Sequence, residues 1–66
     1  MRARVNGVEH ELAAGATVLD VLRLLEIPSN GVAVAVDGEV VPRAAHAGTV
    51  LADGADIEVL TAVQGG

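Results

Sequence analysis

Apolar and polar residues alternate in two short stretches near the start of the chain, residues 3–5 and 8–12. Such alternation is typical of half-buried β-strands. Asn6 and Gly7 lie between the stretches and favour a type I′ turn, because both of its central positions require a positive φ. We therefore predict a β-hairpin whose inward-facing residues are Met1, Ala3, Val5, Val8, His10 and Leu12. At the edge of the core, His10 is expected to be a partly buried neutral histidine.

A helical pattern follows the hairpin. Thr17 is expected to cap the helix, and Asp20 three residues later approximates a capping box. Apolar residues recur at i, i+4 and i+7, and two neighbouring apolar residues broaden the stripe that they form. The stripe consists of Val18, Val21, Leu22, Leu24 and Leu25. Pro28 is expected to stop the helix near Glu26. The pattern predicts one amphipathic helix of about ten residues, with this stripe toward a sheet.

A second hairpin is indicated by residues 32–36, the Asp37-Gly38 turn and residues 39–41. The continuous apolar run 32–36 predicts an internal strand. Its alternation of valine and alanine leaves one side with small groups, where we expect the helix to approach closely. Pro42 is expected to end the following strand, since proline donates no hydrogen bond to a sheet.

The rest of the chain is predicted to hold an irregular segment or short helical turn over 43–49, a third turn at Asp53-Gly54, and a last strand over 57–62. The order hairpin, helix, hairpin, strand predicts an α+β fold with a mixed sheet and one helix across a single face. In the last strand, Ile57 and Val59 are expected to face the core. Glu58, Leu60 and Ala62 then face outward.

Composition narrows the classes of function. The net charge is −5, with four arginines and no lysine, which disfavours nucleic-acid binding. Cysteine is absent, so no disulfide, thiol nucleophile or cysteine metal site is available. No nucleophile–base pair, phosphate loop or metal-ligand spacing is present, so we predict a protein that enzymes act upon, without a bound metal or cofactor. The short apolar runs predict no membrane contact and a cytoplasmic location.

The sequence stops at Gly65-Gly66. Two residues without Cβ atoms form a slender backbone that can pass through a narrow channel. A carboxylate held this way can enter the ATP site of a partner and become an acyl-adenylate. The alternative interpretation is a frayed end without a role, since termini are often poorly ordered.

Four segments together resemble the ThiS family of ubiquitin-like sulfur carriers in thiamine biosynthesis: residues 17–22, 34–43, 51–59 and Val63-Gln64-Gly65-Gly66. The resemblance implies a β-grasp fold with a mixed five-stranded sheet. It also implies a domain over residues 1–62 and a flexible tail over 63–66. Members of this family often have an aromatic residue where this chain has His46, which we expect to be a loop residue.

The resemblance further implies a chemistry. A ThiF-type adenylyltransferase would use Mg-ATP to adenylate Gly66, and a cysteine desulfurase or other persulfide donor would supply sulfur for a thiocarboxylate. A ThiG-type thiazole synthase would then accept that sulfur. Gly65, Gln64 and Val63 would guide the tail. Docking is expected on the sheet face opposite the helix, with Leu60, Ala62, Glu58 and Arg43 as candidate contacts and the free chain a monomer.

Other functions stay open at this stage. Carriers for molybdopterin or cysteine synthesis share the terminal Gly-Gly, and so do ubiquitin-like modifiers that are joined to target lysines. A plain interaction or RNA-binding module of this fold is a further alternative. The acidic composition and the Gly-Gly ending argue against that module.

Overall fold

The computed structural model describes residues 1–28 and 30–61. Two strands, β1 (Arg2–Val5) and β2 (Val8–Glu11), are followed by the helix α1 (Val18–Leu24). Next come β3 (Val32–Val36), β4 (Glu39–Val41), a 3₁₀ helix η1 (Arg43–Ala45) and β5 (Asp56–Thr61). The predictions for Ala62, and the predicted tail 63–66, lie outside the described residues.

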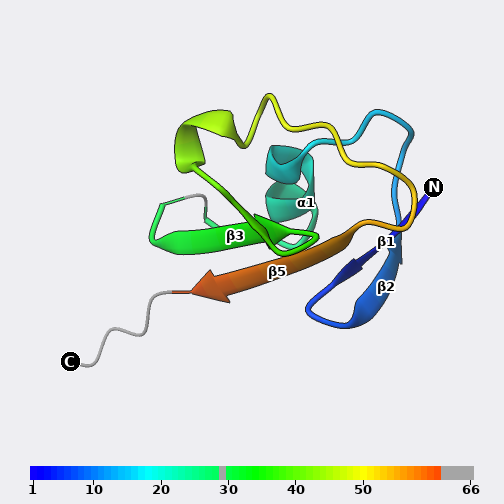
Figure 1. The fold of residues 1–66 in the computed structure, drawn as a ribbon, viewed down its shortest axis with the longest axis horizontal. Helices are drawn as coiled ribbons and strands as arrows, with labels where there is room; N and C mark the ends of the chain where they lie inside the picture. The colour runs from blue at the N-terminus through cyan, green and yellow to red at the C-terminus, as the bar shows by residue number, and fades with distance from the viewer. Residues whose placement is uncertain (29, 62–66) are drawn as a thin grey trace.

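The strands form one mixed five-stranded sheet in the order β2-β1-β5-β3-β4. The central strand β5 runs parallel to β1 and antiparallel to β3, while each hairpin is antiparallel. Helix α1 lies across one face of this sheet (Figure 1). The predicted α+β architecture is therefore confirmed, with β5 placed where both hairpins can pair with it.

The first hairpin has the predicted turn, with φ of 51° at Asn6 and 82° at Gly7. Val5 pairs with Val8, and Ala3 pairs with His10. The pairing places Val8 on the same face as Val5, as predicted, but Val8 is 58% exposed and so is not part of the core. It stands opposite a buried residue, but β2 is an edge strand of the described sheet and Val8 lies at its turn end, where covering neighbours are fewest.

The side chain of Asn6 also joins the two parallel strands. Its Oδ1 accepts from the backbone N–H of Val59 at 2.8 Å, and its Nδ2 donates to the Val59 carbonyl at 3.2 Å. The backbone N–H of Asn6 donates to the Ile57 carbonyl at 2.9 Å. The turn residue thereby extends the β1–β5 pairing beyond the end of β1.

We expect Asn6→Ala to lower the free energy of unfolding by about 2 kcal/mol, because it removes two hydrogen bonds and places alanine at a positive φ. Asn6→Gly, which tolerates that φ but lacks the amide, should lose about 1 kcal/mol. Urea unfolding followed by circular dichroism measures both values. Equal stability of the alanine variant and the unaltered chain would show that the amide bridge contributes nothing.

Helix α1 begins as predicted. The Asp20 N–H donates to Thr17 Oγ1 at 3.2 Å, and the Thr17 N–H donates to Asp20 Oδ2 at 2.9 Å. The first helical N–H groups have partners outside the helix: Val18 donates to the Thr49 carbonyl and Leu19 to the His46 carbonyl, each at 3.1 Å. The segment after η1 is thus attached to the start of the helix.

The helix is shorter than predicted, with seven residues. It ends at Leu24 because Glu26 takes a left-handed φ of 56°, and the Ile27 N–H returns to the Leu22 carbonyl at 2.8 Å. Within the predicted stripe, Val18, Val21 and Leu22 are buried. Leu24 is 56% exposed, so its predicted place in the buried stripe was wrong. Nothing in the described fold covers the side of the helix on which it lies.

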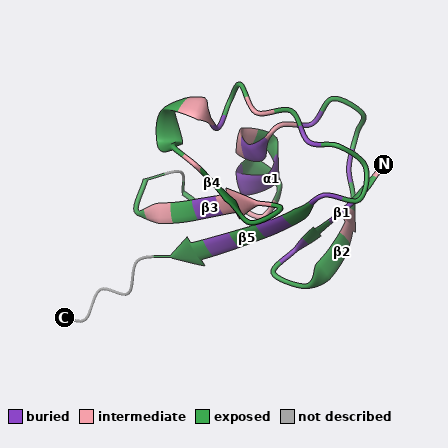
Figure 2. Ribbon diagram, viewed as in Figure 1, coloured by how far each residue is buried: buried purple, intermediate pink, exposed green. Residues whose placement is uncertain are grey.

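The core consists of aliphatic side chains held between α1 and the sheet: Ala3, Val5, Leu12, Ala16, Val18, Val21, Leu22, Val34, Leu51, Ala55, Ile57 and Val59. Buried and exposed residues alternate along β5 (Figure 2). On β3 the helix packs against the valine side, where Val34 is buried, and not against the alanine side as predicted. The valines supply the apolar area that the helix needs, and the alanines face outward.

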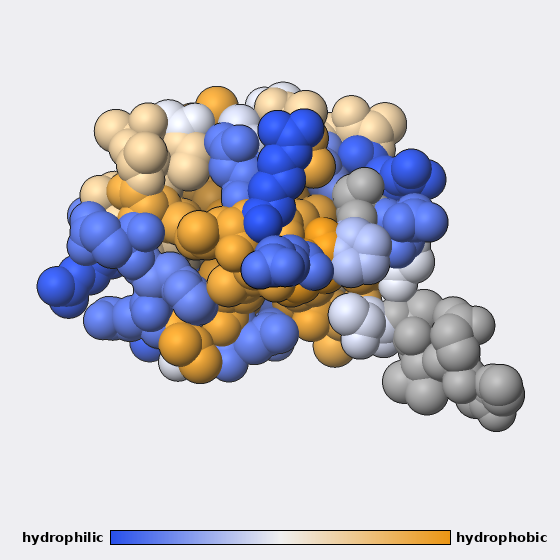
Figure 3. All heavy atoms as spheres, turned by 180° about the vertical axis from the view of Figure 1, so that it is seen from behind, coloured by the Kyte–Doolittle hydropathy of each residue, from blue (hydrophilic) through white to orange (hydrophobic). Residues whose placement is uncertain are grey.

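Two further features complete the packing. His46, predicted to be an ordinary loop residue, has only 2% exposure, and its Nε2–H donates to the Val41 carbonyl at 3.2 Å. Apolar surface also remains outside: seen from behind, apolar residues form much of the middle of the molecule, with hydrophilic residues at the sides and over part of it (Figure 3). A domain of this size has too few residues to cover all of its apolar surface.

Candidate functional site

The open face of the sheet, opposite α1, carries the described candidate residues of β5. Ile57 and Val59 point to the core, as predicted. Glu58 and Leu60 alternate with them and are exposed on the other face. Leu60 is 71% exposed, and Thr61 is the last residue that the structure describes. The predicted outward position of Leu60 is confirmed at the end of the central strand.

Neighbouring strands extend this apolar surface. Ala33 of β3 stands opposite Leu60, and Ala35 stands opposite both Glu58 on one side and Val40 on the other. Val40 is 73% exposed. We call this surface the Leu60 patch; its members are Ala33, Ala35, Val40 and Leu60. They line a shallow hollow of about 120 Å³ together with Glu58 and Val34. Small alanines between two larger side chains make the hollow.

The other half of the open face is charged. Arg2 of β1 contacts Glu9 at 3.5 Å and Glu11 at 3.4 Å across the hairpin. The N-terminal ammonium of Met1 lies 3.1 Å from Glu11 Oε2. That ammonium, with Arg2 as a second cation, holds the pKa of the exposed Glu11 carboxyl below its ordinary value. The open face thus changes from apolar, beside the end of β5, to charged over β1 and β2.

The remaining candidates are not all brought to this surface. Arg43 is exposed in η1, after β4, and does not line the hollow beside Leu60. Ala62, Val63, Gln64, Gly65 and Gly66 lie outside the described residues.

Sequence reasoning missed Val40 and the two alanines of the patch. The pattern of residues 32–41 identified a hairpin, but only the strand order places that hairpin beside β5. The sequence does contain one relevant pattern. Small and β-branched residues alternate along residues 32–36, which indicates that the two faces of this strand differ. The choice of which face the helix covers depends on the whole fold.

Two kinds of feature are absent from the part of the chain that the structure describes. In residues 1–28 and 30–61, no group of three or more histidine or acidic side chains is placed to hold a metal ion. The same described residues contain no helix with the length and apolar character that crossing a bilayer requires.

Comparison with known proteins identifies the family. The sequence model of the ThiS family matches residues 3–66. The crystal structure of a thiamine biosynthesis protein (ThiS) from Geobacter metallireducens superposes with a TM-score of 0.82 at 32% identity, covering 100% of both chains. A solution structure of a thiamine biosynthesis protein from the same organism gives 0.81 at 32% identity, covering 100% of this chain and 88% of the other. No curated protein shows significant sequence similarity. With a match over nearly its whole length, the chain belongs to the ThiS family.

Proposed function

We propose that this protein carries sulfur for the synthesis of the thiamine thiazole ring, on the carboxyl group of Gly66. The observation that carries the proposal is the family match over residues 3–66, which includes the Gly-Gly ending. Two similar solved structures are described as thiamine biosynthesis proteins, and this favours thiamine over the molybdopterin and cysteine pathways. The protein is then a co-substrate of enzymes and not an enzyme itself.

The chemistry of the sequence supports a carboxylate as the point of loading. The chain has no cysteine, so no side chain can hold a persulfide. A free terminal carboxylate, with a pKa of about 3.5, is ionised at neutral pH and is a poor electrophile. In the proposed reaction a Gly66 carboxylate oxygen attacks the α-phosphorus of ATP, and pyrophosphate leaves. The resulting acyl-adenylate has a good leaving group.

Sulfur transfer then follows in two steps. A persulfide sulfur attacks the Gly66 carbonyl carbon, the bond from that carbon to the adenylate oxygen breaks, and AMP leaves. A thiol then attacks the outer sulfur of the acyl disulfide, so that the S–S bond breaks, the thiocarboxylate leaves and the thiol forms a new disulfide with the donor sulfur. The activating enzyme of the ThiF type supplies the ATP site and Mg²⁺, and a thiazole synthase of the ThiG type accepts the sulfur. Both enzymes would bind the segment before Gly66 in the channel that leads to their active sites; this segment is Val63, Gln64 and Gly65.

The Leu60 patch suits the docking step. It is apolar, and its member Leu60 lies near the end of the central strand, six residues before Gly66 in the sequence. The acidic chain, with a net charge of −5, is attracted to a partner with a basic rim around an apolar centre. We therefore place Leu60 and Glu58 in the contact, with Arg43 at its periphery.

Adenylation tests the proposal directly. With the activating enzyme of a thiamine pathway and labelled pyrophosphate, the chain should support exchange of label into ATP. A semisynthetic chain ending in a carboxamide at Gly66 is the matched control, because it keeps every side chain and loses only the nucleophilic oxygen. Exchange at the same rate with the carboxamide chain would place the reaction elsewhere and refute the proposal.

Docking through the patch gives a separate prediction. We expect Leu60→Asp to raise the KM for the carrier in that assay about tenfold with little change in kcat, because a buried apolar contact would be lost equally in ground and transition states. Val8→Asp is the control, since Val8 is also an exposed apolar residue but lies on the edge strand β2, away from the central strand. An unchanged KM for Leu60→Asp would remove the patch from the contact.

A further inference from the structure

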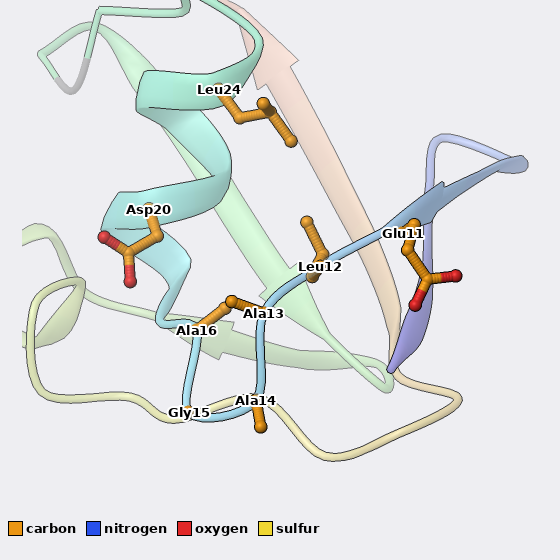
Figure 4. Close-up of a pocket in the computed structure, with 8 residues that line it drawn as sticks. All are labelled: Glu11, Leu12, Ala13, Ala14, Gly15, Ala16, Asp20 and Leu24. Carbon is orange, nitrogen blue, oxygen red and sulfur yellow. The ribbon is translucent and has the colours of Figure 1, made fainter.

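A second apolar surface lies on the helix side of the molecule. The segment that leaves β2 and the outer side of α1 enclose an open groove of about 300 Å³. We call it the helix-side groove; its lining residues are Glu11, Leu12, Ala13, Ala14, Gly15, Ala16, Asp20 and Leu24. Figure 4 shows Leu24 on α1 reaching toward Leu12 across the gap, with only small residues along the connecting segment below them.

The small size of the connector explains why the groove stays open. Residues 13–16 are three alanines and a glycine, so none of them can reach the Leu24 side chain. Leu12 is buried and forms the floor, whereas Leu24 remains more than half exposed although it belongs to the apolar stripe of the helix. Covering an exposed leucine of this kind is favourable by about 1–2 kcal/mol. The groove therefore offers apolar area to another molecule.

Charges at the groove are acidic. Asp20 supplies the carboxylate on the helix side, while Glu11 lines the groove at its far end with its side chain turned away from α1 (Figure 4); the lining contains no cationic side chain. Glu11 already has two cationic neighbours, the Met1 ammonium and Arg2. Asp20 uses Oδ2 for the Thr17 N–H and has no described salt bridge, so its charge is still available. A cation that approached the groove would be attracted mainly on the Asp20 side.

The apolar area and the acidic charge of the groove together favour one kind of binding partner. A second copy of this chain would bring a net charge of −5 to a surface that is itself acidic, so self-association there is disfavoured. We propose that the helix-side groove is a docking surface for a basic amphipathic segment of a partner protein. A leucine-like side chain of that segment would lie between Leu12 and Leu24, and a lysine or arginine beside it would pair with Asp20.

The position of the groove gives it a distinct use. It is formed by α1 and the connector on the covered side of the sheet, whereas the Leu60 patch is on the open side. One partner can thus hold the groove while another occupies the patch. The inference concerns binding at the groove alone and does not depend on the function proposed for Gly66.

Titration of the ¹⁵N-labelled protein with a synthetic peptide tests the inference. The probe is a short helical peptide with two leucines one turn apart and flanking arginines; the control peptide has glutamates in place of the arginines. We expect saturable amide shifts in residues 11–16, 20 and 24, and binding of the arginine peptide about tenfold tighter than that of the glutamate peptide. Added salt should reduce this preference, because exposed charges are screened.

Three variants make the result specific. Leu24→Ser should weaken binding of the arginine peptide about tenfold, because an exposed apolar contact is lost without disturbing the core. Asp20→Asn keeps an oxygen for the Thr17 N–H and should abolish the preference for arginine over glutamate. Leu60→Ser, an equally exposed leucine on the other face, should leave binding unchanged. Equal affinity for the two peptides, shifts centred on residues 33–40 and 60, or full binding to Leu24→Ser would each overturn the inference.

Discussion

Replacing Ile57 with alanine is expected to lower the free energy of unfolding by about 3–4 kcal/mol. The side chain has 0% exposure and lies near the start of β5, the central strand of the sheet, where Ile57 pairs with Val5 on one side and Val36 on the other. Removing three carbon atoms there loses their transfer free energy and leaves a cavity. A domain of this length has a total stability of roughly 3–10 kcal/mol, so the variant should be close to unfolded.

Leu60→Ala is the matched control for that experiment. The residue lies three positions further along the same strand, but its side chain is exposed on the open face. The expected loss is about 0.5 kcal/mol or less, as for other exposed positions. Urea unfolding followed by far-ultraviolet circular dichroism suits both variants, because the chain has no tryptophan. Similar losses in the two variants would contradict the assignment of the two sheet faces.

Removal of Gly65 and Gly66 should abolish sulfur transfer altogether while leaving the urea midpoint unchanged. The chain that stops at Gln64 still has a carboxylate, but it lacks the slender backbone that a narrow active-site channel would admit. Every buried residue of the described fold is retained. Growth without added thiamine, in cells that depend on this copy, measures the effect. Full growth with the shortened chain would show that the terminal glycines are not needed.

Local sequence rules predicted the turns and the helix start well. Asn6 and Asp37 both take a left-handed φ, of 51° and 50°, before glycine. These conformations are set by a few neighbouring residues, and so is the reciprocal capping of Thr17 and Asp20. The alternation over Ile57 and Val59 likewise predicted which face of β5 is buried, because a strand has only two faces.

The predictions that failed concern the burial of side chains by segments that are distant in the sequence. Val8 and Leu24 fit the apolar patterns of their elements, yet they lie at the edge of the sheet and on the outer side of the helix, where no described element packs on them. His46 lies in a turn, as predicted, but its burial was not predicted: it follows the 3₁₀ helix, and its carbonyl accepts from the Leu19 N–H of α1. Burial of this kind depends on which elements become neighbours, and a single sequence does not encode that in its periodicity.

The candidate site also contains some residues that could be predicted from the sequence and others that could not. Leu60 and Glu58 were predicted from the alternation of β5, but Ala33 and Val40 join them only because β3 lies between β5 and β4. The helix-side groove could not be predicted, since it arises from a connector of small residues that passes beside an exposed leucine. Both surfaces come from the sheet order and the helix position, and both remain accessible in the described fold.

The central claim is that cargo is loaded on the final carbonyl of the chain, and intact mass spectrometry tests it most directly. The folded protein is incubated with ATP, the activating enzyme, a persulfide donor and a thiol. The account predicts a mass gain equal to the replacement of one oxygen by sulfur, located by fragmentation at Gly66. An unchanged mass, when a known member of the family is converted in parallel, or sulfur located at any other residue would contradict it.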